Sequence, residues 1–333
     1  MRESDWTRQV LLDTSGGFWK TCALHAAVKL DLFTLIGDKV LTAAELAAKA
    51  ECDERGLATL LNALVSVALL GREGQGYRNT AASFDGLSKK SEHYVGFIVQ
   101  HHAHLMQSWA QADTAVKTGK PIRAQEMWRD ESEREAFVAG MHGVGMANAP
   151  HVTAQLDLAG SRRLLDLGGG SGIYAIHFCL ATPGLTATVF DLPETRPFAE
   201  KTIAEYGVGA RVEFQAGNYL QQSIDGRYDV AWISQVLHAE GPEEGQRILV
   251  KVAAALEPGG RLLVHEFLLE DTLDGPENHA LFSLNMLICT PHGQAFSTAG
   301  LKEMLERAGL QDVRRLEFGG PGGSGIVCGV KPA

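Results

Sequence analysis

Residues 162–172 read RRLLDLGGGSG, and residues 173–181 continue as IYAIHFCLA. The first six residues form a short β-type run centred on leucines, and the apolar residues after the glycines favour a helix. Crowded glycines let the backbone approach a ligand without Cβ clashes. Open α/β sheets bind ligands at the carboxyl ends of their strands. The stretch therefore predicts a strand, a ligand-binding loop and a helix.

The loop follows the pattern Asp-x-Gly-x-Gly-x-Gly from Asp166 to Gly172. A dinucleotide fingerprint GxGxxG begun at Gly168 would need glycine where Ile173 stands, and begun two residues later it starts too far from the strand end. A Walker loop is excluded because no GK[ST] follows. The acidic residue that ends the strand suits a ligand with a cationic end better than one with a pyrophosphate.

A second acid strengthens this interpretation. Asp191 ends the next apolar run, in VFDLP, 25 residues after Asp166 (191 − 166). A carboxylate at the tip of the second strand can accept hydrogen bonds from both hydroxyls of a ribose. Asp191 could instead cap the helix that follows it. We favour the ribose because the two motifs have the expected separation.

Seven strand-like runs follow residue 160, with helical stretches between most of them. They are RRLLDLG, LTATVFDL, RVEFQAG, YDVAWIS, GRLLVHEFLL, LQDVRRLEF and SGIVCGV. This alternation predicts a doubly wound seven-stranded α/β sheet. The last two runs are joined by GGPGGSG without a helix, so we expect an antiparallel hairpin there.

The N-terminal region reads as helix, turn, helix and hairpin, which is the outline of a winged helix. Thr42 and Glu45 have capping-box spacing at the start of LTAAELAAKA. The next helix is predicted over residues 53–70, and GREGQGYRNT is predicted to form the hairpin. A DNA-reading helix should present cations or amides to the bases, but this one carries a single cation, Arg55. We therefore expect a dimerisation module over 1–90, a helical pocket segment over 91–155 and the α/β domain over 156–333.

Composition excludes several classes of protein. The 333 residues carry a net charge of −10, which argues against a broad nucleic-acid surface. No apolar run approaches the roughly 18 residues of a membrane span. The first residues, MRESDWTRQ, lack a signal-peptide core. The five cysteines are scattered without CxxC spacing, as expected of reduced thiols. We expect a cytoplasmic protein without nucleic-acid or membrane partners.

An ordered set of motifs resembles a known family. LLDLGGGSG, FDLPE, GNYL, SQVLHAEGPEE, LEPGGRLLVHEF and NMLICTPHG occur in the order seen in the caffeic-acid-type (plant-type) S-adenosylmethionine-dependent O-methyltransferases and their bacterial relatives. LDLFTLIG, LTAAELAAKA and YRNT extend the resemblance to the N-terminal region. The resemblance implies a class I methyltransferase fold, S-adenosylmethionine as cofactor, a small-molecule substrate and a homodimer.

The resemblance also implies where the cofactor binds. Its methionine part would lie beside Asp166, Gly168 and Gly170, its ribose on Asp191 and its adenine by Leu192, Gly217 and Asn218, with Ser234 nearby. Family members commonly have aspartate where Asn218 stands, and asparagine can still accept a hydrogen bond from the adenine amino group.

The family's general base maps onto His238, and Glu266, 28 residues later (266 − 238), matches the carboxylate that orients it. A hydroxyl is a poor nucleophile until its proton leaves, and a histidine can take that proton. Met141 and Met286 match methionines that hold a flat substrate. The chain departs from the family at Ala239 and Ala295, where many relatives have acids.

His292 stands where relatives often have glycine, so it is assigned to the substrate. His238, His292 and Glu266 could alternatively form a two-histidine, one-carboxylate metal site, as in relatives that methylate carbon in 2-oxo acids, with Arg129 on the acid's carboxylate. O-methylation with His238 as base is the leading hypothesis, and no metal site is assigned.

Overall fold

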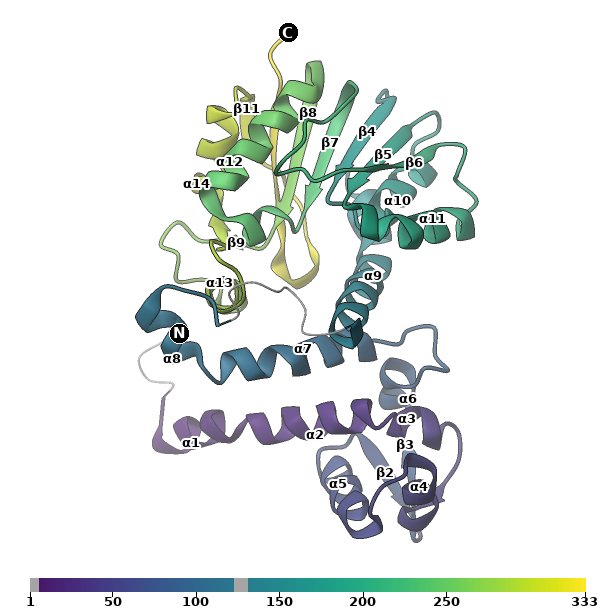
Figure 1. Cartoon of the computed structure of the whole chain (residues 1–333). Coiled ribbons are helices and arrows are strands. Elements are labelled where there is room, and N and C mark those ends of the chain that lie inside the picture. Colours follow the sequence, from purple (N-terminus) through teal and green to yellow (C-terminus); the bar gives the residue numbers. More distant parts are fainter. Residues whose placement is uncertain (1–5, 123–130) are drawn as a thin grey trace. The chain divides into compact units, whose positions relative to one another are not determined.

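The computed structural model describes residues 6–122 and 131–333 (Figure 1). Within these residues the chain forms two compact units. The first comprises residues 6–106 and 131–143, and the second comprises residues 107–122 and 144–333. Helices α7 (Gly96–Trp109) and α9 (Glu131–Ala154) each contribute residues to both units.

The first unit packs short helices around a small sheet with strand order β1-β3-β2. Its remaining helices are α1 (Arg8–Gly16), α2 (Phe18–Lys29), α3 (Leu32–Ile36), α4 (Ala43–Ala50), α5 (Glu54–Ser66) and α6 (Ala81–Leu87). Its strands are β1 (Leu41–Thr42), β2 (Leu70–Glu73) and β3 (Gly76–Asn79). The core is built mainly from apolar side chains of α2, α3, α4 and α5, so the apolar helix faces do bury one another.

Local signals in this unit are confirmed. The Thr42 backbone N–H donates to Glu45 Oε2 at 2.7 Å, and the Glu45 N–H donates to Thr42 Oγ1 at 3.3 Å, which is the predicted capping box. The hairpin β2–β3 is present. The predicted helix 53–70 is shorter than expected. It ends at Ser66, because Ala68 takes a positive φ of 59° and the chain then enters β2.

The second unit contains the seven-stranded sheet, in the order β11-β12-β8-β7-β4-β5-β6 (Figure 1). Its strands are β4 (Arg163–Leu167), β5 (Thr186–Asp191), β6 (Val212–Ala216), β7 (Tyr228–Ser234), β8 (Leu256–Glu266), β11 (Gln311–Arg315) and β12 (Gly325–Val330). Strand β12 is antiparallel to both of its neighbours and the other pairings are parallel. The predicted fold class and the closing hairpin are confirmed.

One predicted strand, residues 260–269, divides in two. Strand β8 stops at Glu266, because its neighbours β7 and β12 pair with it only up to His265 and Glu266. The next residues form β9 (Leu268–Leu269), which pairs with β10 (Phe296–Ser297) in a separate two-stranded sheet. The chain therefore leaves the main sheet directly after Glu266.

Helices cover both faces of the large sheet. Helices α12 (Leu237–Ala255) and α14 (Thr298–Arg307) bury apolar side chains against one face. Helices α10 (Ile173–Ala181), α11 (Arg196–Glu205) and the end of α9 do so against the other. The remaining elements of this unit are α8 (Ala112–Thr118), α13 (Glu277–Cys289) and the 3-10 turns η1 (Pro193–Thr195) and η2 (Pro321–Gly323).

This topology creates one edge where functional groups can meet. Strands β4 to β8 of the large sheet run parallel, so the chain leaves each of them at the same edge. The glycine loop, Asp191, Gly217, Ser234 and Glu266 all lie at these carboxyl ends. No helix among the described residues has both the length and the apolar character needed to cross a membrane.

Candidate active site

The glycine loop after β4 is held in a conformation that needs glycine. Gly168, Gly170 and Gly172 have φ of +66°, +55° and +73°, a region that side chains with a Cβ rarely adopt. A Cβ on Gly168 would also lie 2.6 Å from Val236 Cγ2, whereas one on Gly170 would meet nothing within 4 Å. Gly168 thus permits close packing, and the backbone at Gly170 borders open space that a ligand can enter.

Asp191 links this loop to the end of β5. Its Oδ2 accepts from the Gly170 N–H at 2.7 Å and its Oδ1 accepts from the Leu192 N–H at 2.6 Å. Burial raises the pKa of Asp191, while these two backbone hydrogen bonds oppose that rise. Each carboxylate oxygen has two acceptor sites, so each can accept one further hydrogen bond. That capacity suits a pair of neighbouring hydroxyls.

Asp166 is placed beneath the loop. It is 1% exposed, and its Oδ2 accepts from the Ala175 N–H at 3.2 Å in the first turn of α10. A Cβ on Gly169 would lie 2.7 Å from Asp166 Cγ, so the loop packs directly on the carboxyl group. Burial raises the pKa of Asp166 to about 7. The side chain therefore supports the loop and places a titrating carboxyl group under it.

The end of β6 lies beside Asp191. The Gly217 N–H donates to the Asp191 carbonyl oxygen at 2.8 Å, and a Cβ on Gly217 would lie 2.3 Å from the Phe190 ring. Asn218 Oδ1 accepts from the Leu220 N–H at 2.9 Å, which shapes the following turn. Leu192 thus follows the carboxyl end of β5, and Gly217 and Asn218 follow that of β6.

His238 and Glu266 form a buried pair. His238 Nδ1 lies 2.7 Å from Glu266 Oε2, and the two side chains are 13% and 1% exposed. Glu266 Oε1 accepts from the Leu237 N–H at 2.9 Å. Because a carboxylate only accepts, the His238 Nδ1 must carry the proton. The neutral ring then presents Nε2 as a proton acceptor.

Helix α13 places an aromatic side chain beside this pair and carries a buried thioether side chain one turn later. The Phe282 ring meets the His238 ring edge-on, with centroids 4.8 Å apart. Met286, one turn later on the same helix, is buried. Sequence reasoning singled out Met286 and missed Phe282. The i, i+4 spacing from Met286 is the signal that could have found it.

Other predicted residues are placed differently. Met141 belongs to the first unit, and His238 belongs to the second. His292 is exposed on the loop after α13, and Arg129 lies outside the described residues. Among residues 6–122 and 131–333, no group of three histidine, cysteine or acidic side chains could hold a metal ion. The side chain of the buried Ala295 is a methyl group, and its backbone N–H donates to Ser283 Oγ at 3.1 Å.

Ser234 lies at the end of β7, but its hydroxyl is engaged away from His238. Its Oγ lies 2.9 Å from His265 Nδ1. His265 points to the face of the sheet opposite Glu266, as strand alternation predicts. Sequence reasoning did not foresee this contact, because the two residues lie 31 positions apart.

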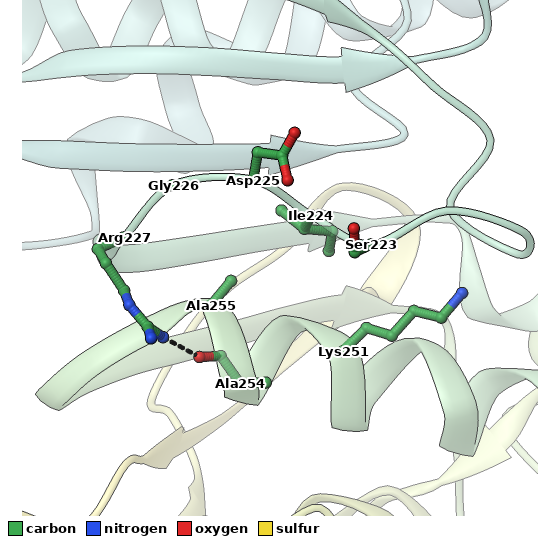
Figure 2. Close-up of a pocket in the computed structure, with 8 residues that line it drawn as sticks. All are labelled: Ser223, Ile224, Asp225, Gly226, Arg227, Lys251, Ala254 and Ala255. Atoms are coloured by element: carbon green, nitrogen blue, oxygen red, sulfur yellow. Dashed lines mark hydrogen bonds between the residues drawn. The ribbon is translucent and has the colours of Figure 1, made fainter.

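A cavity of about 380 Å³ opens at the opposite end of the sheet (Figure 2). It is lined by residues 223–227 before β7 and by Lys251, Ala254 and Ala255 of α12. Arg227 donates to the Ala254 carbonyl, and Lys251 Nζ donates to two carbonyl oxygens at 2.8 Å. Both cations therefore stabilise the backbone, and the cavity is separate from the His238 edge.

A doubly wound seven-stranded sheet with this glycine loop and paired acids defines a class I S-adenosylmethionine-dependent methyltransferase. The chain belongs to the O-methyltransferase family. The family's O-methyltransferase domain matches residues 115–311, and its dimerisation domain matches residues 12–85.

Individual proteins support the same assignment. The chain is 32% identical over 328 residues to the 3-hydroxy-5-methyl-1-naphthoate 3-O-methyltransferase of Streptomyces sahachiroi, covering 97% of this chain and 95% of that protein. PigF with SAH superposes with a TM-score of 0.91 at 26% identity, covering 98% and 100% of the two chains. The human N-acetylserotonin methyltransferase in complex with SAM superposes with a TM-score of 0.87 at 27% identity, covering 100% of both chains. The protein is an S-adenosylmethionine-dependent O-methyltransferase of small molecules, which confirms the predicted family, activity and cofactor.

Proposed function

We propose that this enzyme methylates a hydroxyl group on a flat aromatic small molecule, with His238 as the general base. The observation that carries the proposal is the 2.7 Å contact between His238 Nδ1 and Glu266 Oε2. It fixes the ring orientation and leaves Nε2 to accept the hydroxyl proton. The edge-on Phe282 and the buried Met286 support a planar acceptor. The naphthoate named for the S. sahachiroi relative belongs to this class.

The residues at the glycine loop fit the cofactor. The backbone at Gly170 borders open space, and Asp191 has acceptor capacity left for two hydroxyls. We assign Asp166, Gly168, Gly170 and Ser234 to the amino-acid end, Asp191 to the ribose, and Leu192, Gly217 and Asn218 to the adenine. When bound, S-adenosylmethionine supplies an electrophilic methyl group on a sulfonium centre. Met141 and His292 are assigned to the acceptor.

We also propose a homodimer formed through the first unit. Its helices α1 and α2 carry large apolar side chains that are exposed in the single chain, including Leu12 at 68%, Phe18 at 52% and Trp19 at 73%. Such a patch is typical of an interaction surface. The match of residues 12–85 to a dimerisation domain favours a second copy of this chain as the partner.

The catalytic assignment is tested by His238→Ala. General base catalysis contributes about 10²–10⁴-fold, so kcat should fall by that factor. The dissociation constant for S-adenosylmethionine, measured by calorimetry without acceptor, should change less than threefold. His93→Ala is the matched control and should retain kcat, because this histidine is exposed in the first unit and has no assigned role in the site. Full turnover by His238→Ala would overturn the proposal.

A further inference from the structure

A chain of hydrogen bonds passes through His265 on the face of the sheet that the proton transfer does not use. Ser324 Oγ lies 2.8 Å from His265 Nε2, and Ser234 Oγ lies 2.9 Å from His265 Nδ1. The chain thus links the start of β12 to the carboxyl end of β7.

His265 is held rigidly. It is 3% exposed and stacks on Trp232, with ring centroids 5.3 Å apart and an interplanar angle of 22°. Phe318 and Tyr174 meet the same ring edge-on. Burial lowers the pKa of His265 to about 4, although the Glu266 charge opposes this. The ring is therefore neutral at working pH, so one ring nitrogen donates a hydrogen bond and the other accepts one. Each serine hydroxyl can donate or accept, so both can pair with the ring.

The free end of this chain lies at the proposed cofactor site. Ser234 pairs with His265 in the β7–β8 register, and Trp232 pairs with Asp166 in the β4–β7 register. Paired residues share a face, and so do alternate residues of β7, so Asp166, Ser234 and His265 lie on one side of the sheet. Ser324 and His265 are buried, whereas Ser234 is half-buried and accessible to a ligand.

We propose that His265 is a positioning residue that fixes the Ser234 hydroxyl for the amino-acid end of S-adenosylmethionine. A serine hydroxyl without a partner samples several side-chain rotamers. Holding it in one rotamer before binding removes an ordering cost that would otherwise weaken affinity. This inference rests on the proposed assignment of Ser234 to the cofactor. In it, His265 acts on the cofactor through Ser234 and does not itself contact the cofactor.

The test compares variants that keep or remove the partner of Ser234. Asparagine carries its amide on Cγ, where His265 carries Nδ1, so His265→Asn retains a partner for Ser234. Glutamine carries its amide one carbon further out, so His265→Gln retains a partner for Ser324 alone. Dissociation constants for S-adenosylmethionine and S-adenosylhomocysteine are measured by calorimetry on the full chain, without acceptor.

We expect His265→Gln and Ser234→Ala to weaken binding by about tenfold each, as the loss of one hydrogen bond does. His265→Asn should stay within about threefold of wild type, and the Ser234→Ala/His265→Gln double variant should be no weaker than Ser234→Ala alone. Equal effects of His265→Asn and His265→Gln on the dissociation constants would show a purely structural role and overturn the inference. Multiplicative effects of the two changes in the double variant would do the same.

Thermal midpoints separate folding from positioning. His265→Asn and His265→Gln should lower the thermal unfolding midpoint by similar amounts, because each variant leaves one serine hydroxyl without its partner. Their dissociation constants for the cofactor should nevertheless differ. The outcome is independent of the catalytic proposal, since His238→Ala does not enter these measurements. If wild-type protein failed to bind the cofactor at all, the proposed function would fail first.

Discussion

Glu266 uses both carboxylate oxygens at once. One accepts from the His238 imidazole and the other from the Leu237 N–H at the start of α12. The carboxylate thus orients the base and also fixes the helix that carries it. The motifs predicted the residue types at these positions. The backbone contact of the second oxygen follows only from how β8 and α12 pack.

Replacing this anion tests its orienting role. Glu266→Gln keeps an acceptor for the Leu237 N–H but can present its NH₂ group to His238 Nδ1, which favours the wrong tautomer. We expect kcat to fall by about 10²–10⁴-fold, as when the carboxylate of a catalytic histidine pair is made neutral. Cofactor affinity should stay within threefold of wild type. Steady-state kinetics and calorimetry check both values, and an unchanged kcat would contradict the role.

Asp166 predicts a pH dependence of cofactor binding. Burial raises its pKa to about 7, so the carboxyl group of the free enzyme is increasingly protonated below that pH. A cationic ligand favours the ionised form, and binding must then release a proton. The apparent dissociation constant should therefore rise about tenfold per pH unit below pH 7 and level off above it.

Calorimetry between pH 5.5 and 7.5, in buffers with different ionisation enthalpies, measures this affinity and the released proton. Asp166→Asn should bind more weakly at pH 7.5 but with a flat profile. A wild-type profile that is equally flat would show that Asp166 does not sense the cofactor's charge.

At the scale of elements, the loop after α13 packs on the first turns of α12. The Gln294 N–H donates to the His238 carbonyl oxygen at 2.8 Å. Two glycines allow this approach. A Cβ on Gly241 would lie 2.1 Å from the His292 carbonyl oxygen, and one on Gly293 would lie 2.4 Å from the His238 carbonyl oxygen. The succession of strands and helices along the chain was predictable from periodicity, but this loop contact was not.

Gly293→Ala tests the contact. The added methyl group must push the loop away from His238, and such overpacking costs about 1–3 kcal/mol of stability. We expect kcat to fall by more than tenfold, with cofactor affinity nearly unchanged. Gly300→Ala in α14 is the matched control. Its Cβ would come no closer than 3.5 Å to Ser297 Oγ, so it should stabilise the helix by about 0.5–1 kcal/mol and retain activity. Denaturant unfolding and kinetics measure both, and equal behaviour of the two variants would contradict the account.

The whole molecule combines two units, of which the first is proposed to form the dimer interface and the second carries the candidate active site. The first unit carries the exposed apolar side chains of α1 and α2, and the second carries the His238 edge. Apolar periodicity in the sequence predicted helices for the first unit and therefore a mainly helical module. It did not predict which apolar side chains remain exposed, since that depends on which helix faces pack together.

The exposed side chains predict an effect on assembly. Trp19→Glu places a charge in the proposed interface, and a charge left unpaired there strongly opposes association. Analytical ultracentrifugation should then show a shift from dimer to monomer. Val250→Glu, at a 48% exposed position on α12 in the other unit, is the control and should leave the dimer intact. A Trp19→Glu variant that stays dimeric at low micromolar concentration would contradict an interface at α2.

The sequence alone determined the strand–glycine loop–helix unit, the succession of the seven strands along the chain and the acids at 166 and 191. These features depend on local chemistry: glycine is required where φ is positive, and apolar periodicity is read over a few residues. Tertiary structure decided which side chains meet, such as Ser324 with His265 across 59 residues and Phe282 with His238. Such contacts depend on the packing of distant elements against one sheet, and no local pattern records that packing.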